Sequence, residues 1–265
     1  MSVAEFSPDI RMMSPAASSV VGNHVLSVEH LSVSFDGFKA VDDLSLSIEP
    51  KELRVIIGPN GAGKTTLLDM ICGKTKPTTG HIYFKGTDLT TLAEHEIVHE
   101  GVGRKFQTPS TYEDLSVLEN FEISIPVGRG VFGSIFFKRT AAIRERIEQI
   151  AGDVFLSDQL KTKAGKLSHG QKQWLEIGML LAQNSELLLL DEPVAGMSPR
   201  ERELTAALLK KISAGKSLIV IEHDMDFVKS IANKVTVLHQ GKVLAEGNVE
   251  AMQNDERVID VYLGH

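Results

Sequence analysis

A glycine-rich segment lies between a short apolar run and a stretch with helical spacing. It reads Gly-Pro-Asn-Gly-Ala-Gly-Lys-Thr over residues 58–65 and fits the pattern G-x-x-x-x-G-K-[ST]. Glycines let several backbone N–H groups point into one concavity, and a following helix N-terminus adds positive potential that suits a polyphosphate. Lys64 would reach the β- and γ-phosphates, and the Thr65 hydroxyl would bind Mg²⁺. The predicted nucleotide cradle comprises Gly58, Pro59, Asn60, Gly61, Ala62, Gly63, Lys64, Thr65 and Thr66.

A pair of acids ends another apolar run, residues 187–190. If that run is a buried strand, Asp191 lies at its carboxyl end, where doubly wound folds bind their ligands. Asp191 could hold Mg²⁺ through water, and Glu192 could polarise an attacking water. Two acids at a strand end are ordinary by themselves. Beside a phosphate cradle they favour nucleotide hydrolysis.

The elements that must position these residues follow from hydrophobic patterning. Residues 55–57, 187–190 and 218–221 are continuous apolar runs, typical of buried parallel strands. A helical pattern over residues 200–212 separates the last two runs. The alternation predicts an α/β core of the P-loop NTPase type with a parallel sheet.

The remaining segments are expected to surround that core. Residues 25–48 alternate in short apolar segments, separated by Asp36-Gly37 and Asp42-Asp43, which predicts an antiparallel β subdomain. Residues 234–247 predict a hairpin that turns at Gln240-Gly241. Buried-strand signals vanish over about 109–166, where 139–150 looks helical, so we expect an inserted helical subdomain. We expect a flexible tail over 1–24 and one domain over 25–265.

Composition limits the class of protein. The chain has 265 residues, is 42% hydrophobic and carries a formal net charge of −7, which argues against a role in nucleic-acid binding. The single cysteine, Cys72, excludes an intramolecular disulfide and a cysteine-rich zinc module and is expected to be a packed core residue. No apolar run approaches the ~20 residues of a membrane span, and no signal peptide is visible. We therefore expect a soluble cytoplasmic protein.

Further motifs resemble those of the ATP-binding subunits of ABC transporters, in the order that family shows. Leu-Ser-His-Gly-Gln at 167–171 resembles the ABC signature, and Gln107 lies in a Q-loop context, Arg-Lys-Phe-Gln-Thr. His223 occupies the switch-histidine position in Ile-Glu-His-Asp, and Phe35 matches the aromatic of the A-loop. The resemblance covers the chain from residue 25 onwards and implies an ABC ATPase fold that binds ATP and Mg²⁺.

The resemblance also implies a role for each matching residue. Phe35 would stack on adenine, although aromatics near edge strands are often simple core residues. Gln107 would contact Mg²⁺ or the attacking water, and His223 would bond the γ-phosphate and act in catalysis with Glu192. The signature residues Ser168, Gly170 and Gln171 would face the nucleotide held by a second ATP-binding subunit, so the function requires a homodimer or heterodimer.

Local patterning gives the signature a second, purely structural interpretation. Ser168 is a good N-cap, and the helix it begins would bury Trp174 in the core. Two positions depart from the common family pattern: His169 replaces the first glycine of a Gly-Gly pair, and Ser198 stands where the D-loop usually carries Asp.

One motif suggests a different chemistry. His95-Glu-Ile-Val-His99 fits H-E-x-x-H, the helix motif of zinc proteases, and Glu119 could supply a third ligand. Nothing else in the chain calls for a metalloprotease. We therefore interpret these side chains as the polar face of an exposed helix over 88–100.

Two classes of ABC ATPase remain open. One is the energy-coupling subunit of a membrane importer; the other is a soluble ATPase acting on ribosomes or DNA, which usually carries two cassettes or a coiled coil. A single cassette favours the importer, which would lie peripherally at the inner face of the cell membrane, with permease subunits and indirectly a substrate-binding protein as partners. A terminal Tyr-Leu-Gly at 262–264 resembles the importer branch for branched-chain amino acids and urea. Phrases such as Leu-Ser-His-Gly-Gln-Lys-Gln-Trp-Leu-Glu-Ile-Gly-Met-Leu-Leu are similar to the urea-type subunit of that branch in particular. We expect urea transport, with branched-chain amino acid import as the alternative.

Overall fold

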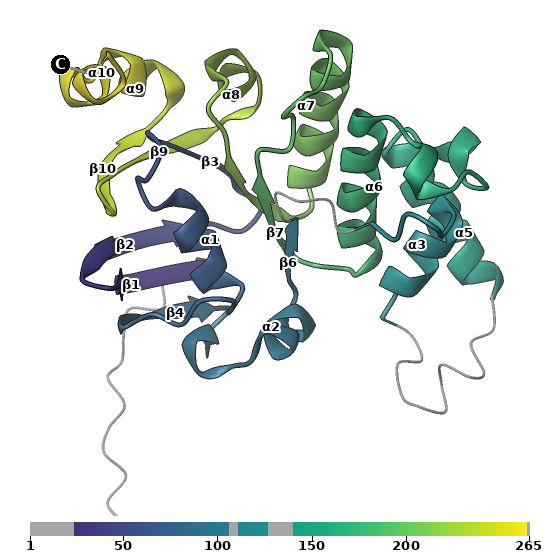
Figure 1. Cartoon of the computed structure of the whole chain (residues 1–265), viewed down its shortest axis with the longest axis horizontal. Helices are drawn as coiled ribbons and strands as arrows, with labels where there is room; N and C mark the ends of the chain where they lie inside the picture. The colour runs from purple at the N-terminus through teal and green to yellow at the C-terminus, as the bar shows by residue number, and fades with distance from the viewer. Residues whose placement is uncertain (1–23, 106–110, 127–139, 264–265) are drawn as a thin grey trace, which may run out of the picture.

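The computed structural model describes residues 24–105, 111–126 and 140–263. It contains a six-stranded sheet, a four-stranded sheet and helices on both sides of the larger sheet (Figure 1). The strands are β1 (Leu26–Phe35), β2 (Phe38–Ile48), β3 (Leu53–Ile57), β4 (Thr79–Phe84), β5 (Thr87–Asp88), β6 (Val102–Lys105), β7 (Leu187–Asp191), β8 (Ser217–Ile221), β9 (Lys234–His239) and β10 (Lys242–Gly247). The α-helices are α1 (Lys64–Ile71), α2 (Glu94–Glu100), α3 (Val117–Ser124), α5 (Ala141–Asp153), α6 (His169–Ala182), α7 (Pro199–Ser213), α8 (Met225–Ile231), α9 (Val249–Asn254) and α10 (Glu256–Leu263).

The larger sheet has the order β10-β9-β3-β8-β7-β6. Its strands run parallel except for β10, which pairs antiparallel with β9. Every residue of β3, β7 and β8 is buried, which confirms the interpretation of the three apolar runs as buried parallel strands. The carboxyl ends of these strands share one edge, so the segments that follow them are brought together there.

Side chains alternate between two hydrophobic cores across this sheet. Leu188 and Leu190 of β7 pack in the core formed with helices α3, α5, α6, α7 and α8. Leu187 and Leu189 pack in the core shared with α1 and the smaller sheet. Burying one such side chain stabilises the fold by about 1.5–3 kcal/mol, so both faces anchor the strand that ends at Asp191.

The smaller sheet is antiparallel, with the order β2-β1-β4-β5. The prediction that Asp42-Asp43 separates two strands is wrong, because β2 runs through both residues. Asp43 adopts φ 55, and the pairing with β1 shifts register there. Its N–H donates to the hydroxyl of Ser32 over 2.8 Å, so a bulge accommodates the pair without ending the strand.

The described part of the segment 109–166 contains α3, α5 and two short 3₁₀ helices, and α6 packs against both α-helices. A Cβ on Gly178 of α6 would lie 2.6 Å from the ring of Phe121, so glycine permits this close approach. The hairpin of β9 and β10 turns at Gln240-Gly241 as predicted, and Cys72 is buried. Among the helices in the described ranges, none is long and apolar enough to cross a membrane.

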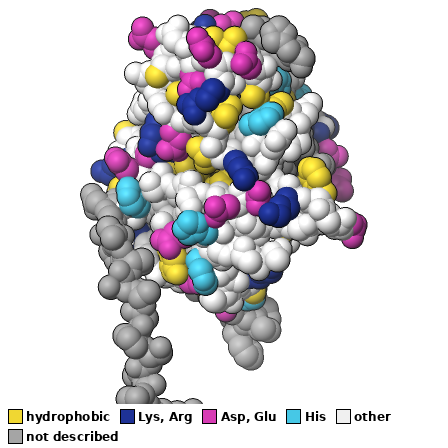
Figure 2. Space-filling model, turned by 90° about the vertical axis from the view of Figure 1, so that its left-hand side faces the viewer, with side chains coloured by type: hydrophobic (Ala, Val, Ile, Leu, Met, Phe, Trp, Pro, Cys, Tyr) yellow, Lys and Arg dark blue, Asp and Glu magenta, His cyan; other side chains and the backbone are white. Residues whose placement is uncertain are grey.

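Charged side chains of both signs and histidines are interspersed over one side of the molecule (Figure 2). On that view the hydrophobic side chains form small separate patches.

Candidate functional site

The phosphate cradle connects β3 to α1 and is held in shape by two crowded glycines. Gly58 adopts φ 151, and a Cβ there would lie 2.2 Å from the carbonyl oxygen of Leu238. Gly63 adopts φ 98, and a Cβ there would lie 2.5 Å from the carbonyl oxygen of Ala40. Neither position has room for a side chain, so the glycines of the motif are required by packing as well as by backbone conformation.

Lys64 is folded over this loop. Its Nζ donates to the carbonyl oxygens of Gly58 at 2.7 Å and Pro59 at 3.0 Å. Burial lowers the pKa of Lys64, while the negative charges of Glu192 and Asp191 oppose that shift. The ammonium group is therefore placed beside the cradle and the two predicted acids.

Thr65 and Asp191 form a pair of oxygen donors at the start of α1. The Thr65 hydroxyl lies 3.2 Å from Oδ2 of Asp191, whose residue is 2% exposed. Burial raises the pKa of Asp191, opposed by the bond from Thr65 and the charge of Arg104, whose Nη2 is 3.9 Å from the carboxylate. A hydroxyl next to a carboxylate is a donor set that suits Mg²⁺.

Glu192 has different partners from the adjacent Asp191. Its backbone adopts φ 46, which is unusual for a residue with a side chain, and its N–H donates to the carbonyl of Ile221 at 3.0 Å. Glu192 Oε1 lies 3.3 Å from Nδ1 of His223, at the end of β8. The structure thus brings two sequence-predicted catalytic residues together. Gln107 lies outside the described residues.

A buried acid beside them was missed by the sequence interpretation. Glu222 is 1% exposed, and its carboxylate accepts bonds from the N–H groups of Val194 at 3.4 Å and His223 at 3.3 Å. Burial raises the pKa of Glu222, partly offset by these two bonds. Its place between an apolar strand and a candidate histidine was the available signal.

Arg104 was also missed. It forms a close ion pair with Asp69 of α1 and approaches Asp191, so it links β6 to the cradle helix and to the end of β7. Its place just before the Q-loop motif was the available signal.

The signature begins α6 with a capping box. Ser168 Oγ accepts from the N–H of Gln171 at 3.2 Å, and the Gln171 side chain accepts from the Ser168 N–H at 3.0 Å. The predicted N-cap is confirmed. Trp174 is buried and donates to the hydroxyl of Thr205 at 2.9 Å, which confirms its expected place in the core.

Ser198, the second departure from the family pattern, is the N-cap of α7. Its hydroxyl lies 2.8 Å from Oε2 of Glu201, which also accepts from the Ser198 N–H at 2.8 Å. These bonds hold the pKa of Glu201 below its usual range. Serine therefore has a structural role at this D-loop position.

Phe35 ends β1 and pairs across the hairpin with Phe38. Its side chain is 48% exposed, so it is not a buried core aromatic. The following strand is tied to the cradle, because Asp42 N–H donates to Gly241 O at 3.0 Å and Gly241 N–H donates to Ala62 O at 3.1 Å. The hairpin is thus anchored to the nucleotide cradle, with an aromatic ring accessible at its tip.

The H-E-x-x-H residues have other contacts. Glu96 accepts from the N–H of Ala93 at 2.7 Å at the start of α2, and Glu119 accepts from the N–H of Ser116 at 2.7 Å at the start of α3. Both acids are therefore helix-capping residues. Within the described ranges, no group of three or more His, Cys, Asp or Glu side chains could hold a metal ion.

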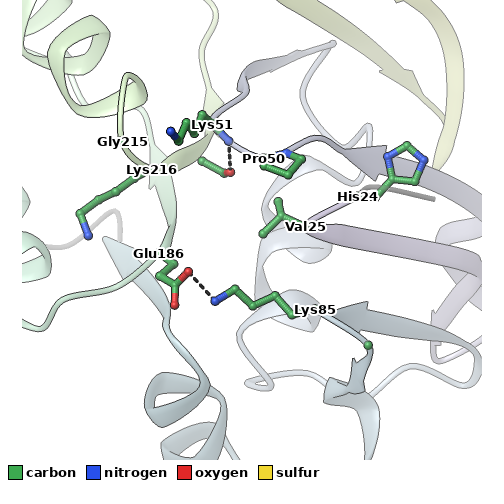
Figure 3. A pocket seen from close by; sticks show the side chains of 10 residues that line it. His24, Val25, Pro50, Lys51, Lys85, Glu186, Gly215 and Lys216 are labelled. Atoms are coloured by element: carbon green, nitrogen blue, oxygen red, sulfur yellow. Dashed lines mark hydrogen bonds and ion pairs between the residues drawn. The ribbon is translucent and has the colours of Figure 1, made fainter. Parts of the chain in front are cut away.

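A cavity of about 520 Å³ lies at the other edge of the larger sheet, where β3 and β8 begin (Figure 3). Lys85 and Glu186 form an ion pair in it, and the Lys51 N–H donates to the Ser217 hydroxyl at 2.8 Å. None of the predicted site residues lines this cavity. The candidate site therefore lies at the carboxyl ends of the parallel strands, where the cradle, Asp191, Glu192 and His223 come together.

Comparisons with known proteins agree with this geometry. Residues 41–195 match the family described as "ABC transporter", and residues 242–265 match "Branched-chain amino acid ATP-binding cassette transporter". The chain is 33% identical to a probable branched-chain amino acid transport ATP-binding protein, LivG, of Methanocaldococcus jannaschii, over 91% of this chain and 97% of that one. It is 34% identical to the high-affinity branched-chain amino acid transport ATP-binding protein BraF of Pseudomonas aeruginosa, over 91% and 98% of the two chains.

Solved structures show the same fold. The ADP conformation of MJ1267, an ATP-binding cassette of an ABC transporter, has a TM-score of 0.80 and 33% identity, covering 91% of this chain and 99% of that one. A dimeric, post-hydrolysis cassette bound to ADP and Pi, MJ0796, has a TM-score of 0.71 and 26% identity, covering 84% and 98%.

Proposed function

The chain belongs to the ABC transporter ATP-binding family, and we propose that it powers an importer of the branched-chain amino acid type. It hydrolyses ATP, the activity of this family. The observation that carries the proposal is the joint match: residues 41–195 match the ABC transporter family, and residues 242–265 match the family described as "Branched-chain amino acid ATP-binding cassette transporter".

Hydrolysis is proposed to occur at the strand edge described above. The ATP phosphates occupy the cradle of residues 58–65, where Lys64 and the backbone N–H groups neutralise their charge. Glu192 orients and polarises the attacking water, and His223, 3.3 Å from its carboxylate, stabilises charge on the γ-phosphate. Thr65 and Asp191 would hold Mg²⁺, with Gln107, and the ion supplies charge neutralisation of the phosphates.

A second ATP-binding subunit is proposed to complete the site. Ser168, Gly170 and Gln171 begin α6 and would meet the nucleotide held by the partner's cradle. The related dimeric cassette bound to ADP and Pi supports a dimeric working state. Whether the partner is a second copy or a different cassette, each subunit contributes half of each of two sites.

The helical subdomain and the Q-loop around Gln107 are proposed to contact the permease subunits, which place the chain peripherally at the inner face of the cell membrane. The relatives named above are described as ATP-binding proteins of branched-chain amino acid transport, so these solutes are the first candidates. Urea is the second candidate, because the segment Leu-Ser-His-Gly-Gln-Lys-Gln-Trp-Leu-Glu-Ile-Gly-Met-Leu-Leu at 167–181 is similar to urea-type cassettes.

Uptake tests the proposal. The chain is co-expressed with the permease subunits and the substrate-binding protein of its transporter, and the cells are given labelled leucine or labelled urea. We expect leucine uptake that is lost in Glu192→Gln. Uptake of urea alone would transfer the assignment to the second candidate, and uptake of neither solute with an intact complex would overturn both.

A further inference from the structure

His169 makes a contact that a glycine at this position could not make. Its ring Nε2 lies 2.9 Å from the carbonyl oxygen of Ala195, in the loop between β7 and α7. A carbonyl oxygen only accepts, so this contact is a hydrogen bond in the tautomer that carries the proton on Nε2. The side-chain amide of Gln173 lies 3.2 Å from the same ring nitrogen and, in that tautomer, turns its oxygen toward it. The side chain of His169 therefore ties the first residue of the signature helix to the D-loop of its own subunit.

Close packing accompanies this bond. Gly196 adopts φ 71, and a Cβ there would lie 3.1 Å from Cδ2 of His169. A Cβ on Gly170 would lie 2.3 Å from Oε1 of Glu201, the acid that caps α7 together with Ser198. His169 and Gly170 of the signature therefore both contact the segment that contains the D-loop and the start of α7.

The same loop is bonded to the hydrolytic residues. Ala195 N–H donates to the carbonyl of Glu192 at 3.2 Å. Further along, Arg202 donates through Nε to the carbonyl of Met197 at 3.2 Å and forms an ion pair with Asp224, which follows His223 directly. Hydrogen bonds and close packing therefore run from the signature to the residues that face the nucleotide of the same subunit.

We propose that His169 is a positioning residue that couples the signature helix to the D-loop, so that the two half-sites of one subunit move together. This inference rests on the proposed function, since it requires the signature to act on a partner's nucleotide. Loss of the bond would then slow turnover without weakening nucleotide binding to the subunit's own cradle.

The test compares His169→Ala with His169→Gln. The amide nitrogen of glutamine lies as many bonds from Cβ as Nε2 of the histidine does, and it can donate to the same carbonyl oxygen of Ala195. His95→Ala, an exposed histidine of α2, is the matched control. We expect His169→Ala to lower kcat about 3- to 10-fold, the factor for one neutral hydrogen bond, with ADP affinity within about twofold of wild type. His169→Gln and His95→Ala should keep kcat within about twofold.

Three results would overturn the proposal: unchanged kcat in His169→Ala, equal loss in His169→Gln and His169→Ala, or a parallel fall in ADP affinity. Thermal unfolding of each variant shows whether a loss of kcat comes from a loss of folding stability; a fall in kcat with an unchanged melting temperature supports coupling. Failure of the proposed function looks different, because a signature that does not act on a partner's nucleotide would leave hydrolysis unchanged in Ser168→Ala.

Discussion

The hydroxyl of Thr65 donates to the carboxylate of Asp191 over 3.2 Å, although the two residues are 126 positions apart in the chain. The contact joins the first turn of α1 to the end of β7. It brings the phosphate cradle and the acidic strand end into one site, because parallel strands present their carboxyl ends at a common edge.

Replacement of Lys64 tests the cradle. Lys64→Ala removes the ammonium group beside the loop carbonyls, so we expect ATP turnover to fall at least ~100-fold. Steady-state hydrolysis and equilibrium nucleotide binding measure the loss. Lys51→Ala, at the opposite edge of the sheet, is the control and should hydrolyse ATP normally; full activity of Lys64→Ala would refute the assignment.

The aromatic pair at the tip of the β1–β2 hairpin offers an internally matched comparison. If Phe35 stacks on adenine, Phe35→Ala should raise KM for ATP about 10-fold, as expected for one base–aromatic contact, and Phe35→Trp should not. Phe38 is 64% exposed on the neighbouring strand, and Phe38→Ala should leave KM unchanged. Equal effects of the two alanine variants would argue against a specific role for Phe35.

Glu222 predicts a pH dependence of stability. Burial raises its pKa in the folded protein above the ordinary value of 4.5. Its contribution to folding stability is therefore fully present below about pH 4.5 and is lost as pH rises through the folded-state pKa.

Glu222→Gln removes this titration at the cost of one acceptor oxygen, a penalty that does not depend on pH. The melting temperature of the variant minus that of wild type should therefore increase between pH 5 and pH 8. Thermal unfolding across that range measures it, and a constant or decreasing difference would contradict the burial of an ionisable Glu222.

Composite sites predict complementation between two inactive variants. Lys64→Ala lacks a working cradle, and Ser168→Ala lacks the signature hydroxyl. A mixed dimer retains one intact site, built from the cradle of one chain and the signature of the other. If the chain forms homodimers, an equimolar mixture should recover about a quarter of wild-type hydrolysis when subunits exchange randomly. No recovery, with exchange verified, would rule out a site completed in trans by Ser168.

Much of the fold is predictable because its signals are local. The unbroken apolar runs of β7 and β8 predict buried parallel strands, and the Gln240-Gly241 turn predicts the last hairpin. The bulge at Asp43 is not predictable in this way, because a Ser32 hydroxyl on another strand satisfies its N–H. Only the tertiary pairing shows that a polar pair continues the strand.

The site divides along the same line. Lys64, Asp191 and Glu192 belong to motifs with short spacing, so their residue types and their order along the chain are enough to predict them as site residues. Glu222 and the Arg104–Asp69 pair act through burial and long-range contacts, so their positions beside known motifs mark them as candidates without giving their partners. The solute also lies beyond local patterning. Our expectation of urea has no support among the relatives named above, which are described as ATP-binding proteins of branched-chain amino acid transport, and the alternative fits them better.

Glu192→Gln tests the central claim most directly. The substitution keeps the size of the side chain that lies beside His223 but removes the carboxylate that activates water. With ATP and Mg²⁺, we predict hydrolysis at least ~100-fold slower than wild type and a dimer that persists with intact ATP bound, measured by phosphate release and by the mass of the complex in solution. Wild-type hydrolysis by Glu192→Gln, with no ATP-dependent dimer, would contradict the account.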